Sequence, residues 1–512
     1  MSAGVAAVAA EGETPGRSQV RGSSLLMAGR VLSLLFTVST QVLVVRSLST
    51  TDYAVVAYAL ALVASGRMLL SLGQGKILSR FLSHYDERGE PDRMLGSLVL
   101  AMLTIAVTSA ACFAVLPFVA GDLLDSVSTA DDAVAVLLVL VLLAPMEAMD
   151  QVFIALFAVF TKPRAIFFRK YVLTPGLRLL VVVLLAVTGQ SALFLAIGYV
   201  FAQAVGLLLY AVMLTGVFRH RGLTAHLRPS RLTLPIGPVL RLALPTLTGE
   251  LVFLSMTTGS VVLLGLYWGA PELAAYAAVL PAARLNQFVY SAFGTLYLPT
   301  AARLHARGDR AGSLAAYWHT AVVVAVFSFP VLAMTTVFAS GTTVLLFGER
   351  YASSAAVLAL LSVGYYVNAA LGHNAYTLAA FARGRLLTTV NVTCALTNLL
   401  LCWLLVPEHG AVGVGIANCA TLALQNALYQ WGTGRVLGCA PLPRSRVRPY
   451  LLVLAACGVL LLVDVALQPG VLVAIPLVLL VWAGLLVLAR EQLELGKTFP
   501  ELRRVPLVGR LL

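Results

Sequence analysis

The stretch "RGDRAGSL" at residues 307–314 has a close match earlier in the chain, "RGEPDRMLGSL" at residues 88–98. Their shared Asp, Arg, Gly, Ser and Leu lie 216 or 217 residues apart. Three further pairs keep the same order at separations of 218 to 221 residues: "VAYALAL" with "AAYAAVL", "GRVL" with "GELV", and "FTKPR" with "FARGR". Ordered matches at one spacing indicate an internal duplication.

The composition assigns the duplicated unit to a membrane. Of the 512 residues, 60% are hydrophobic and only 11% are charged, whereas soluble domains are about one quarter charged. Apolar runs of about 20 residues, long enough to cross the hydrocarbon core as a helix, recur along the chain. We therefore predict an all-α polytopic membrane protein with about fourteen transmembrane helices: 23–45, 52–75, 94–120, 133–159, 168–187, 191–216, 239–266, 272–300, 313–338, 352–380, 386–406, 411–434, 450–467 and 471–489.

Each repeat contains six predicted spans. Because six is even, both copies enter the membrane from the same side, so the sequence predicts two parallel lobes. Two similar lobes can rock against each other and open a central cleft to one side at a time. The predicted parts are a disordered cytoplasmic tail (1–22), an N-terminal lobe (23–217), a basic cytoplasmic linker (218–238), a C-terminal lobe (239–437), two further helices (438–489) and a second cytoplasmic tail (490–512).

The net charge of +13 follows the predicted topology. With both termini cytoplasmic, 29 of the 35 Lys and Arg residues fall on the cytoplasmic side and four fall inside spans. Only Arg46 and Arg350 fall in outer loops. This asymmetry obeys the positive-inside rule, so we attribute the basic balance to topology and to anionic lipid headgroups, and we expect no nucleic-acid partner.

Several ionisable residues lie inside the predicted spans, where they usually face a cavity or a charged partner. Arg67 and Arg284 occupy the same place in the two repeats, and Arg30 occupies the place of Glu250. Polar residues follow these arginines at helical spacing, which predicts a polar, cationic central cleft that favours an anionic group such as a pyrophosphate. The candidate substrate-binding residues are Arg30, Arg67, Arg284, Glu250, Gln41 and Gln287.

Glu147 and Asp150 lie three residues apart in the fourth predicted span. Carboxylates inside a membrane can bind Na⁺ or carry a proton, so both residues are candidates for ion coupling. They could equally pair with an interior arginine and stabilise the fold. The residues alone favour neither interpretation.

The sequence contains no pattern typical of a catalytic or metal site. Its six cysteines include no CxxC pair, so we expect no metal and no resident cofactor beyond a coupling Na⁺ or proton. A membrane-embedded glycosyltransferase or polymerase would need a sizeable outer loop, and the longest predicted outer loops have about a dozen residues. We therefore predict a transporter and not an enzyme.

Two stretches resemble a known family. "SLSTTDYAVVAYALALVASGRMLLSLGQGKILSRFL" (47–82) and "NLLLCWLLVPEHGAVGVGIA" (398–417) are similar to polysaccharide and lipid-linked oligosaccharide flippases of the multidrug/oligosaccharidyl-lipid/polysaccharide exporter superfamily. The resemblance implies two six-helix lobes in a V shape and alternating access. It also implies that the substrate is an undecaprenyl-pyrophosphate-linked glycan, flipped across the cytoplasmic membrane for cell-surface polysaccharide biosynthesis.

The same resemblance leaves two alternatives, a lipid II flippase and a small-molecule or drug exporter of the same fold. Lipid II flippases of the superfamily carry cleft arginines in helices 1, 2 and 8, at the places of Arg30, Arg67 and Arg284, although Leu35 and Phe36 occupy the place of a further helix 1 arginine. Drug exporters of the superfamily usually have twelve helices, so fourteen predicted spans argue against that branch.

The expected partners are the lipid-linked glycan and membrane lipids, with glycosyltransferases or a polymerase of the same pathway as candidates.

Overall fold

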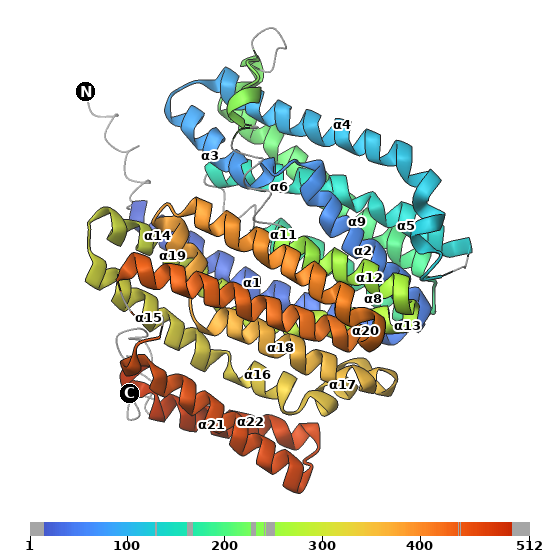
Figure 1. The fold of residues 1–512 in the computed structure, drawn as a ribbon. Helices are drawn as coiled ribbons and strands as arrows, with labels where there is room; N and C mark the ends of the chain where they lie inside the picture. Colours follow the sequence, from blue (N-terminus) through green and yellow to red (C-terminus); the bar gives the residue numbers. More distant parts are fainter. Residues whose placement is uncertain are drawn as a thin grey trace, which may run out of the picture. The chain divides into compact units, whose positions relative to one another are not determined.

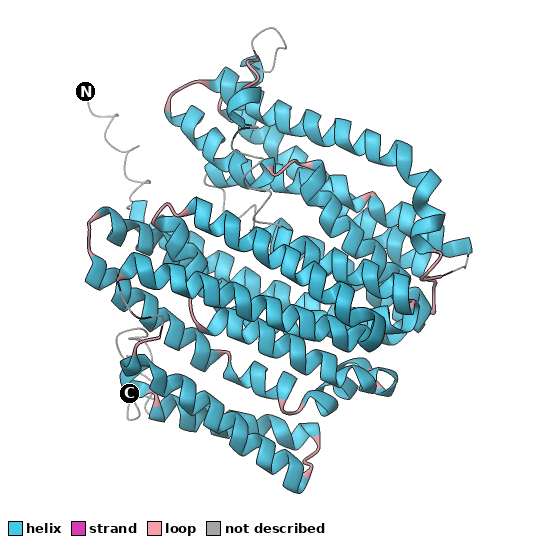
Figure 2. Ribbon diagram, in the orientation of Figure 1, coloured by secondary structure: helices cyan, strands magenta, loops and turns pink. Residues whose placement is uncertain are grey.

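The computed structural model describes residues 15–128, 131–160, 167–226, 232–239, 241, 251–438, 440 and 442–493. Every regular element in these residues is a helix, and no strand occurs among them (Figures 1 and 2). This result confirms the predicted all-α class.

The described helices have the lengths and the surfaces of membrane spans. Among the described residues, ten helices are long and apolar enough to cross a membrane, or eleven if a pair bent by 43° counts as one span. Large apolar side chains such as Phe118, Val187 and Leu462 are exposed on these helices, as expected for surfaces that face lipid. The chain is therefore a polytopic membrane protein, and fourteen spans stays a prediction.

One long helix is interrupted where the sequence predicts a boundary between two spans. α20 (Gly384–Leu437) has 54 residues, and Gly410 inside it adopts a non-helical conformation with φ 52° and ψ −132°. A continuous helix of this length would be about 80 Å long, far more than a bilayer needs. The Glu272 carboxylate accepts a hydrogen bond from the Ala411 backbone N–H at 2.8 Å, which caps the helix that follows the break.

The chain divides into two compact units, and the first comprises Met1–Val44, Gly66–Phe118 and Leu138–Leu244. Its core packs Leu82, Phe157 and Tyr210 from three different helices. The helices that lie wholly or partly in this unit are α1 (Pro15–Ser47), α2 (Thr50–Leu70), α3 (Gln74–Glu87), α4 (Pro91–Leu124), α5 (Asp131–Val141), α6 (Leu143–Val159), the π-helix η1 (Phe167–Leu173), α8 (Thr174–Thr188), α9 (Ala192–His220) and η2 (Leu223–His226).

The second unit comprises Val45–Ser65, Val119–Leu137 and Pro245–Leu512. Its core packs Phe329 and Tyr366 against Leu460 and Val478. Besides α20 and parts of α1, α2, α4 and α5, its helices are α11 (Leu251–Leu254), η4 (Ser255–Gly259), α12 (Ser260–Trp268), α13 (Ala270–Arg284), η5 (Leu285–Gln287), α14 (Phe288–Ala306), α15 (Arg310–Phe327), α16 (Phe329–Thr336), α17 (Ala339–Phe347), η6 (Glu349–Ser354), α18 (Ala355–Ala370), α19 (Asn374–Ala380), α21 (Arg444–Leu467), α22 (Val471–Leu488) and α23 (Arg490–Leu493).

Two arginines connect the segment that begins at Val45 with the rest of the second unit. Arg46 donates hydrogen bonds to the Leu345 and Leu346 carbonyls at 2.5 and 3.0 Å, and Arg350 donates to the Val45 carbonyl. These are the two arginines that the sequence places in outer loops. The predicted lobe boundaries, 23–217 and 239–437, stay predictions.

Two predicted spans are broken just after their interior arginines. α2 ends at Leu70, Leu72 and Gly73 adopt left-handed conformations (φ 45° and 74°), and α3 begins as a separate helix. The predicted continuous span 52–75 is therefore wrong at its end, because two successive left-handed residues cannot continue an α-helix. In the second unit, α13 ends at Arg284 and the 3-10 turn η5 separates it from α14.

Candidate functional site

In the first unit, three half-buried charges from three helices meet at Glu147 of α6. Its Oε1 lies 3.1 Å from Nη2 of Arg178 in α8, and its Oε2 lies 3.5 Å from Nη1 of Arg67 in α2. Arg178 also lies over the Tyr199 ring, at 5.3 Å from the ring centroid. The side chains of Glu147, Arg67 and Arg178 are 21%, 30% and 27% exposed. Two cations share one carboxylate, so this cluster carries a surplus positive charge.

A second acid lies one turn further along α6. Asp150 forms an ion pair with Arg169 of the π-helix η1, and Arg169 is only 2% exposed. The Arg169 guanidinium lies 4.6 Å from the centroid of the Tyr210 ring. At Gly206 of α9, a Cβ atom would lie only 2.8 Å from Arg169 Nε, so a residue without a side chain is needed there.

Sequence reasoning did not select Arg169, because it lies at the cytoplasmic boundary of a predicted span. The sequence carried only an indirect signal. Two acids in one span require positive partners in neighbouring spans, and Arg169 is one of the few cations in the next predicted span, 168–187. Both acids pair with arginines in the structure, and ion coupling stays a prediction.

The other predicted residues of the first unit are placed as follows. Arg30 is half-buried in α1, and its Nε donates to the Tyr171 hydroxyl at 3.5 Å. Gln41 is half-buried in the same helix. Glu250 lies outside the described residues.

In the second unit, Arg284 ends α13 and has aromatic partners. Its Nε donates to the Tyr365 hydroxyl at 3.2 Å. Its guanidinium lies 5.4 Å from the Phe253 ring centroid and 5.9 Å from that of Tyr365. No acid among the described residues pairs with Arg284, and the partners that these residues give its guanidinium are one hydroxyl and two aromatic ring faces.

Gln287 begins a chain of hydrogen bonds between neutral side chains. Its Nε2 donates to Asn368 Oδ1 at 2.8 Å, and Asn368 Nδ2 donates to Gln425 Oε1 at 3.3 Å. Gln425 Nε2 then donates to Asn391 Oδ1 at 3.2 Å, and the Tyr429 hydroxyl donates to the same oxygen at 2.5 Å. We call these five residues the amide row. Of them, sequence reasoning selected only Gln287 as a candidate, because amides carry no charge that marks them in an apolar span.

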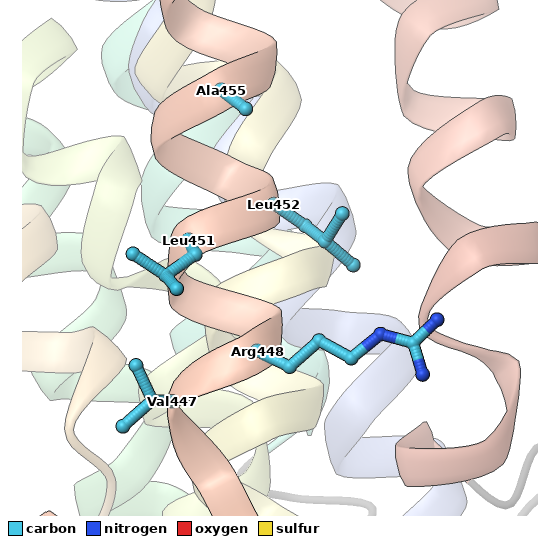
Figure 3. Close-up of a pocket in the computed structure, with 5 residues that line it drawn as sticks. All are labelled: Val447, Arg448, Leu451, Leu452 and Ala455. Atoms are coloured by element: carbon cyan, nitrogen blue, oxygen red, sulfur yellow. The ribbon is translucent and has the colours of Figure 1, made fainter. Parts of the chain in front are cut away.

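One surface hollow lies apart from these residues. It measures about 540 Å³ and is lined by Val447, Arg448, Leu451, Leu452 and Ala455 of α21 (Figure 3). Arg448 forms an exposed ion pair with Glu491 at 3.6 Å. No predicted site residue lines this hollow. No group of three metal-ligating side chains occurs among the described residues.

Comparison with known proteins identifies the family. Residues 19–305 match the family described as polysaccharide biosynthesis protein, and the chain belongs to that family. No curated protein sequence matches the chain.

Solved structures share the fold. A lipid II flippase, MurJ, in an inward closed conformation has a TM-score of 0.71 at 14% identity, over 92% of this chain and 99% of that one. A multidrug resistance MATE family transporter, inward-facing, has a TM-score of 0.68 at 14% identity, over 79% and 95%. A MATE transporter in complex with MaL6 has 0.59 at 16%, over 83% and 97%. This is a polytopic membrane protein of polysaccharide biosynthesis with the fold of flippases and exporters.

Proposed function

We propose that this protein is a flippase that moves an undecaprenyl-pyrophosphate-linked oligosaccharide or polysaccharide repeat unit from the inner to the outer leaflet of the cytoplasmic membrane. Membership in a polysaccharide biosynthesis family supports the glycan part of the substrate. The fold shared with a lipid II flippase and with multidrug transporters supports transport by alternating access.

The observation that carries the proposal is the surplus of positive charge within the membrane spans. Arg67 and Arg178 share one carboxylate in the first unit, and Arg284 has only neutral partners among the described residues of the second. An uncompensated cation in a low-dielectric region is costly unless an anion binds it. A pyrophosphate is a suitable anion, because a guanidinium can bind phosphate oxygens through two parallel hydrogen bonds.

The geometry at Glu147 suggests how the first unit takes a phosphate. The contact between Glu147 and Arg67 is the longer of its two, at 3.5 Å against 3.1 Å to Arg178. A phosphate can therefore replace Glu147 at Arg67 while the carboxylate stays with Arg178. Glu147 never becomes an unpaired charge in this exchange, so the step avoids the desolvation cost of a lone carboxylate.

The remaining parts of the proposal concern topology and coupling. Both termini are cytoplasmic by the distribution of Lys and Arg. We assign coupling to Na⁺ or a proton to Glu147 and not to Asp150, because the Glu147 side chain is 21% exposed, whereas Asp150 is 12% exposed and pairs with the nearly buried Arg169. Glycosyltransferases or a polymerase that make or consume the glycan-linked lipid are the proposed partners.

The test is a lipid extraction from cells depleted of this protein, with mass spectrometry of polyprenyl-pyrophosphate glycans. Build-up of one glycan-linked lipid, reversed by the wild-type protein and not by Arg67→Ala or Arg284→Ala at equal expression, would support the proposal. Arg93→Ala is the matched control, because Arg93 is an exposed arginine that pairs with Glu90 at 2.9 Å outside the cluster.

Two outcomes would replace this proposal. Build-up of lipid II alone would make the protein a lipid II flippase. Retention of small toxic compounds without any lipid build-up would make it an exporter, and the arginines would then need another explanation.

A further inference from the structure

The amide row (Gln287, Asn368, Gln425, Asn391 and Tyr429) connects η5, α18 and α20 in the second unit. Its hydrogen bonds run in one direction, from the Gln287 amide to the Asn391 oxygen, over distances of 2.8, 3.3 and 3.2 Å. Such a chain fixes the orientation of each amide, since every carbonyl oxygen after the first faces an N–H group.

The side chains at one end of the amide row are partly accessible, and those at the other end are buried. Gln287, Asn368 and Gln425 are half-buried, whereas Asn391 is 9% exposed and Tyr429 is 6% exposed. Lipid offers no hydrogen-bond partner, so half-exposed amides in a membrane span face water or a polar ligand. The three accessible amides therefore present a polar, uncharged surface.

A second pair of amide side chains in the same unit is fully buried and serves only to join helices. Asn398 Nδ2 donates to Asn418 Oδ1 at 2.8 Å, and Asn418 Nδ2 donates to the Tyr276 hydroxyl at 3.1 Å. Asn398, Asn418 and Tyr276 are all 0% exposed. This pair holds helices together and meets no ligand, so it is a natural control for the amide row.

The accessible amides have unused hydrogen-bonding capacity. Among the described residues, Asn368 uses its carbonyl oxygen and one of its two N–H groups within the row. Neutral donors and acceptors in fixed positions suit the hydroxyl groups of a sugar, which donate and accept and carry no charge. An anion would use only the donors of such a surface and a cation only the acceptors.

Arg284 lies directly beside the row. Arg284 bonds to Tyr365, and Gln287 bonds to Asn368. Each residue of the second pair lies three positions after its counterpart in the first pair, so both contacts join residues 81 positions apart. One helical turn, about 5 Å, separates the two contacts. A phosphate at Arg284 would therefore place the sugar attached to it next to Gln287 and Asn368.

We propose that the accessible part of the amide row is a sugar subsite, which binds the sugar residue nearest to the pyrophosphate. This inference rests on the proposed flippase function and adds to it that the second unit distinguishes a glycan-bearing lipid from the bare polyprenyl pyrophosphate. The hydrogen bonds of Asn368 and Gln287 to sugar hydroxyls supply that preference, and Arg284 supplies the affinity common to both lipids.

The experiment uses the full-length protein in lipid nanodiscs and measures the binding of two kinds of probe. One probe is undecaprenyl pyrophosphate without a sugar, and the other is a panel of undecaprenyl pyrophosphates that each carry one hexose or N-acetylhexosamine. The wild-type protein should bind at least one sugar-bearing probe more tightly than the bare lipid. Asn368→Leu, which keeps the size of the side chain, should weaken that binding about fivefold to tenfold, the factor of one lost neutral hydrogen bond, and leave the bare lipid unaffected.

Three further variants separate sugar recognition from folding and from binding of the phosphate. Gln287→Met should have the same selective effect, and it tests the row even if Asn368→Leu does not fold. Asn398→Leu, in the closed amide pair, should lower the thermal unfolding midpoint without changing the ratio between the two affinities. Arg284→Ala should weaken binding of both kinds of probe.

The outcomes are distinct. If the wild-type protein binds the bare lipid and no sugar-bearing probe more tightly, the subsite is wrong and the flippase proposal stands. The subsite is also wrong if folded Asn368→Leu and Gln287→Met weaken both kinds of probe equally, or neither. If the wild-type protein binds no probe at all, the proposed function fails and the subsite fails with it.

Discussion

Arg67 and Arg284 occupy matching places in the two copies of the repeat, yet their partners differ in chemistry. Arg67 bonds to Glu147, 80 residues further along, and Arg284 bonds to Tyr365, 81 residues further along. The helices that bring each pair together correspond, so one copy has a carboxylate where the other has a phenol. The matching arginines of the two predicted copies therefore have different counterparts.

The difference extends beyond these two pairs. The first unit places Arg169, Asp150, Glu147 and Arg178 in ion pairs, whereas the second unit has amides and hydroxyls along α18 and α20. Ion pairs in low dielectric need both partners, while neutral hydrogen bonds cost less when one is lost. We therefore expect the first unit to be the more sensitive to loss of a single polar side chain, and the second to be the more selective for ligands.

The largest expected effect is on stability, in the first unit. Arg169→Met leaves Asp150 buried without a counter-charge and should lower the free energy of unfolding by about 3–5 kcal/mol. A thermal unfolding midpoint in detergent would measure this loss. The double variant Arg169→Met with Asp150→Leu should recover most of it, and a single variant as stable as the wild type would show that the ion pair does not hold this unit together.

The next effect concerns Arg284, which has no acidic partner among the described residues. Arg284→Ala should reduce transport of the glycan-linked lipid by about 10- to 100-fold, because a charge-assisted hydrogen bond to phosphate contributes roughly 1.5–3 kcal/mol. Uptake into proteoliposomes of known protein content would measure it. Arg284→Lys keeps the positive charge and should retain part of the activity. An equal loss in both variants would indicate that transport depends on the two parallel hydrogen bonds of the guanidinium and not on its charge.

A smaller effect is expected at Arg67, because Glu147 already shares its charge. Arg67→Ala should reduce transport by about tenfold, and Glu147→Gln should raise the affinity for the bare pyrophosphate lipid about threefold by freeing Arg67. Equilibrium binding to nanodiscs would measure the second change. If Glu147→Gln weakens binding, the exchange of Glu147 for a phosphate is wrong.

A further substitution removes the difference between the two units by giving the second unit an acid like that of the first. Tyr365→Glu gives Arg284 a carboxylate partner and should weaken binding of the pyrophosphate lipid about threefold, since the new acid competes with phosphate for one guanidinium. Tyr365→Phe is the control, and it should change binding less than twofold, because it removes one hydroxyl and adds no charge. An unchanged affinity in Tyr365→Glu would mean that Arg284 does not contact the phosphate.

The sequence predicted the class of fold from features that are local along the chain. Apolar runs of about 20 residues, the asymmetry of Lys and Arg and the repeat near 219 residues are all visible without contacts. The same features predicted that Arg67 and Arg284 correspond. They did not predict the break at Leu72 and Gly73, because a glycine such as Gly73 can end a helix but also occurs within membrane helices, and Leu72 carries no such signal.

What only the tertiary structure decided is which polar side chains meet. Glu147 contacts arginines 80 residues before it and 31 residues after it, and Asn368 contacts amides 81 and 57 residues away. The rotation of each helix about its axis determines these pairings, and it is set by packing against several neighbours at once. The sequence by itself therefore determined a duplicated membrane transporter with interior arginines. The structure determined that Arg67 pairs with an acid, whereas Arg284 meets a hydroxyl and aromatic rings among the described residues.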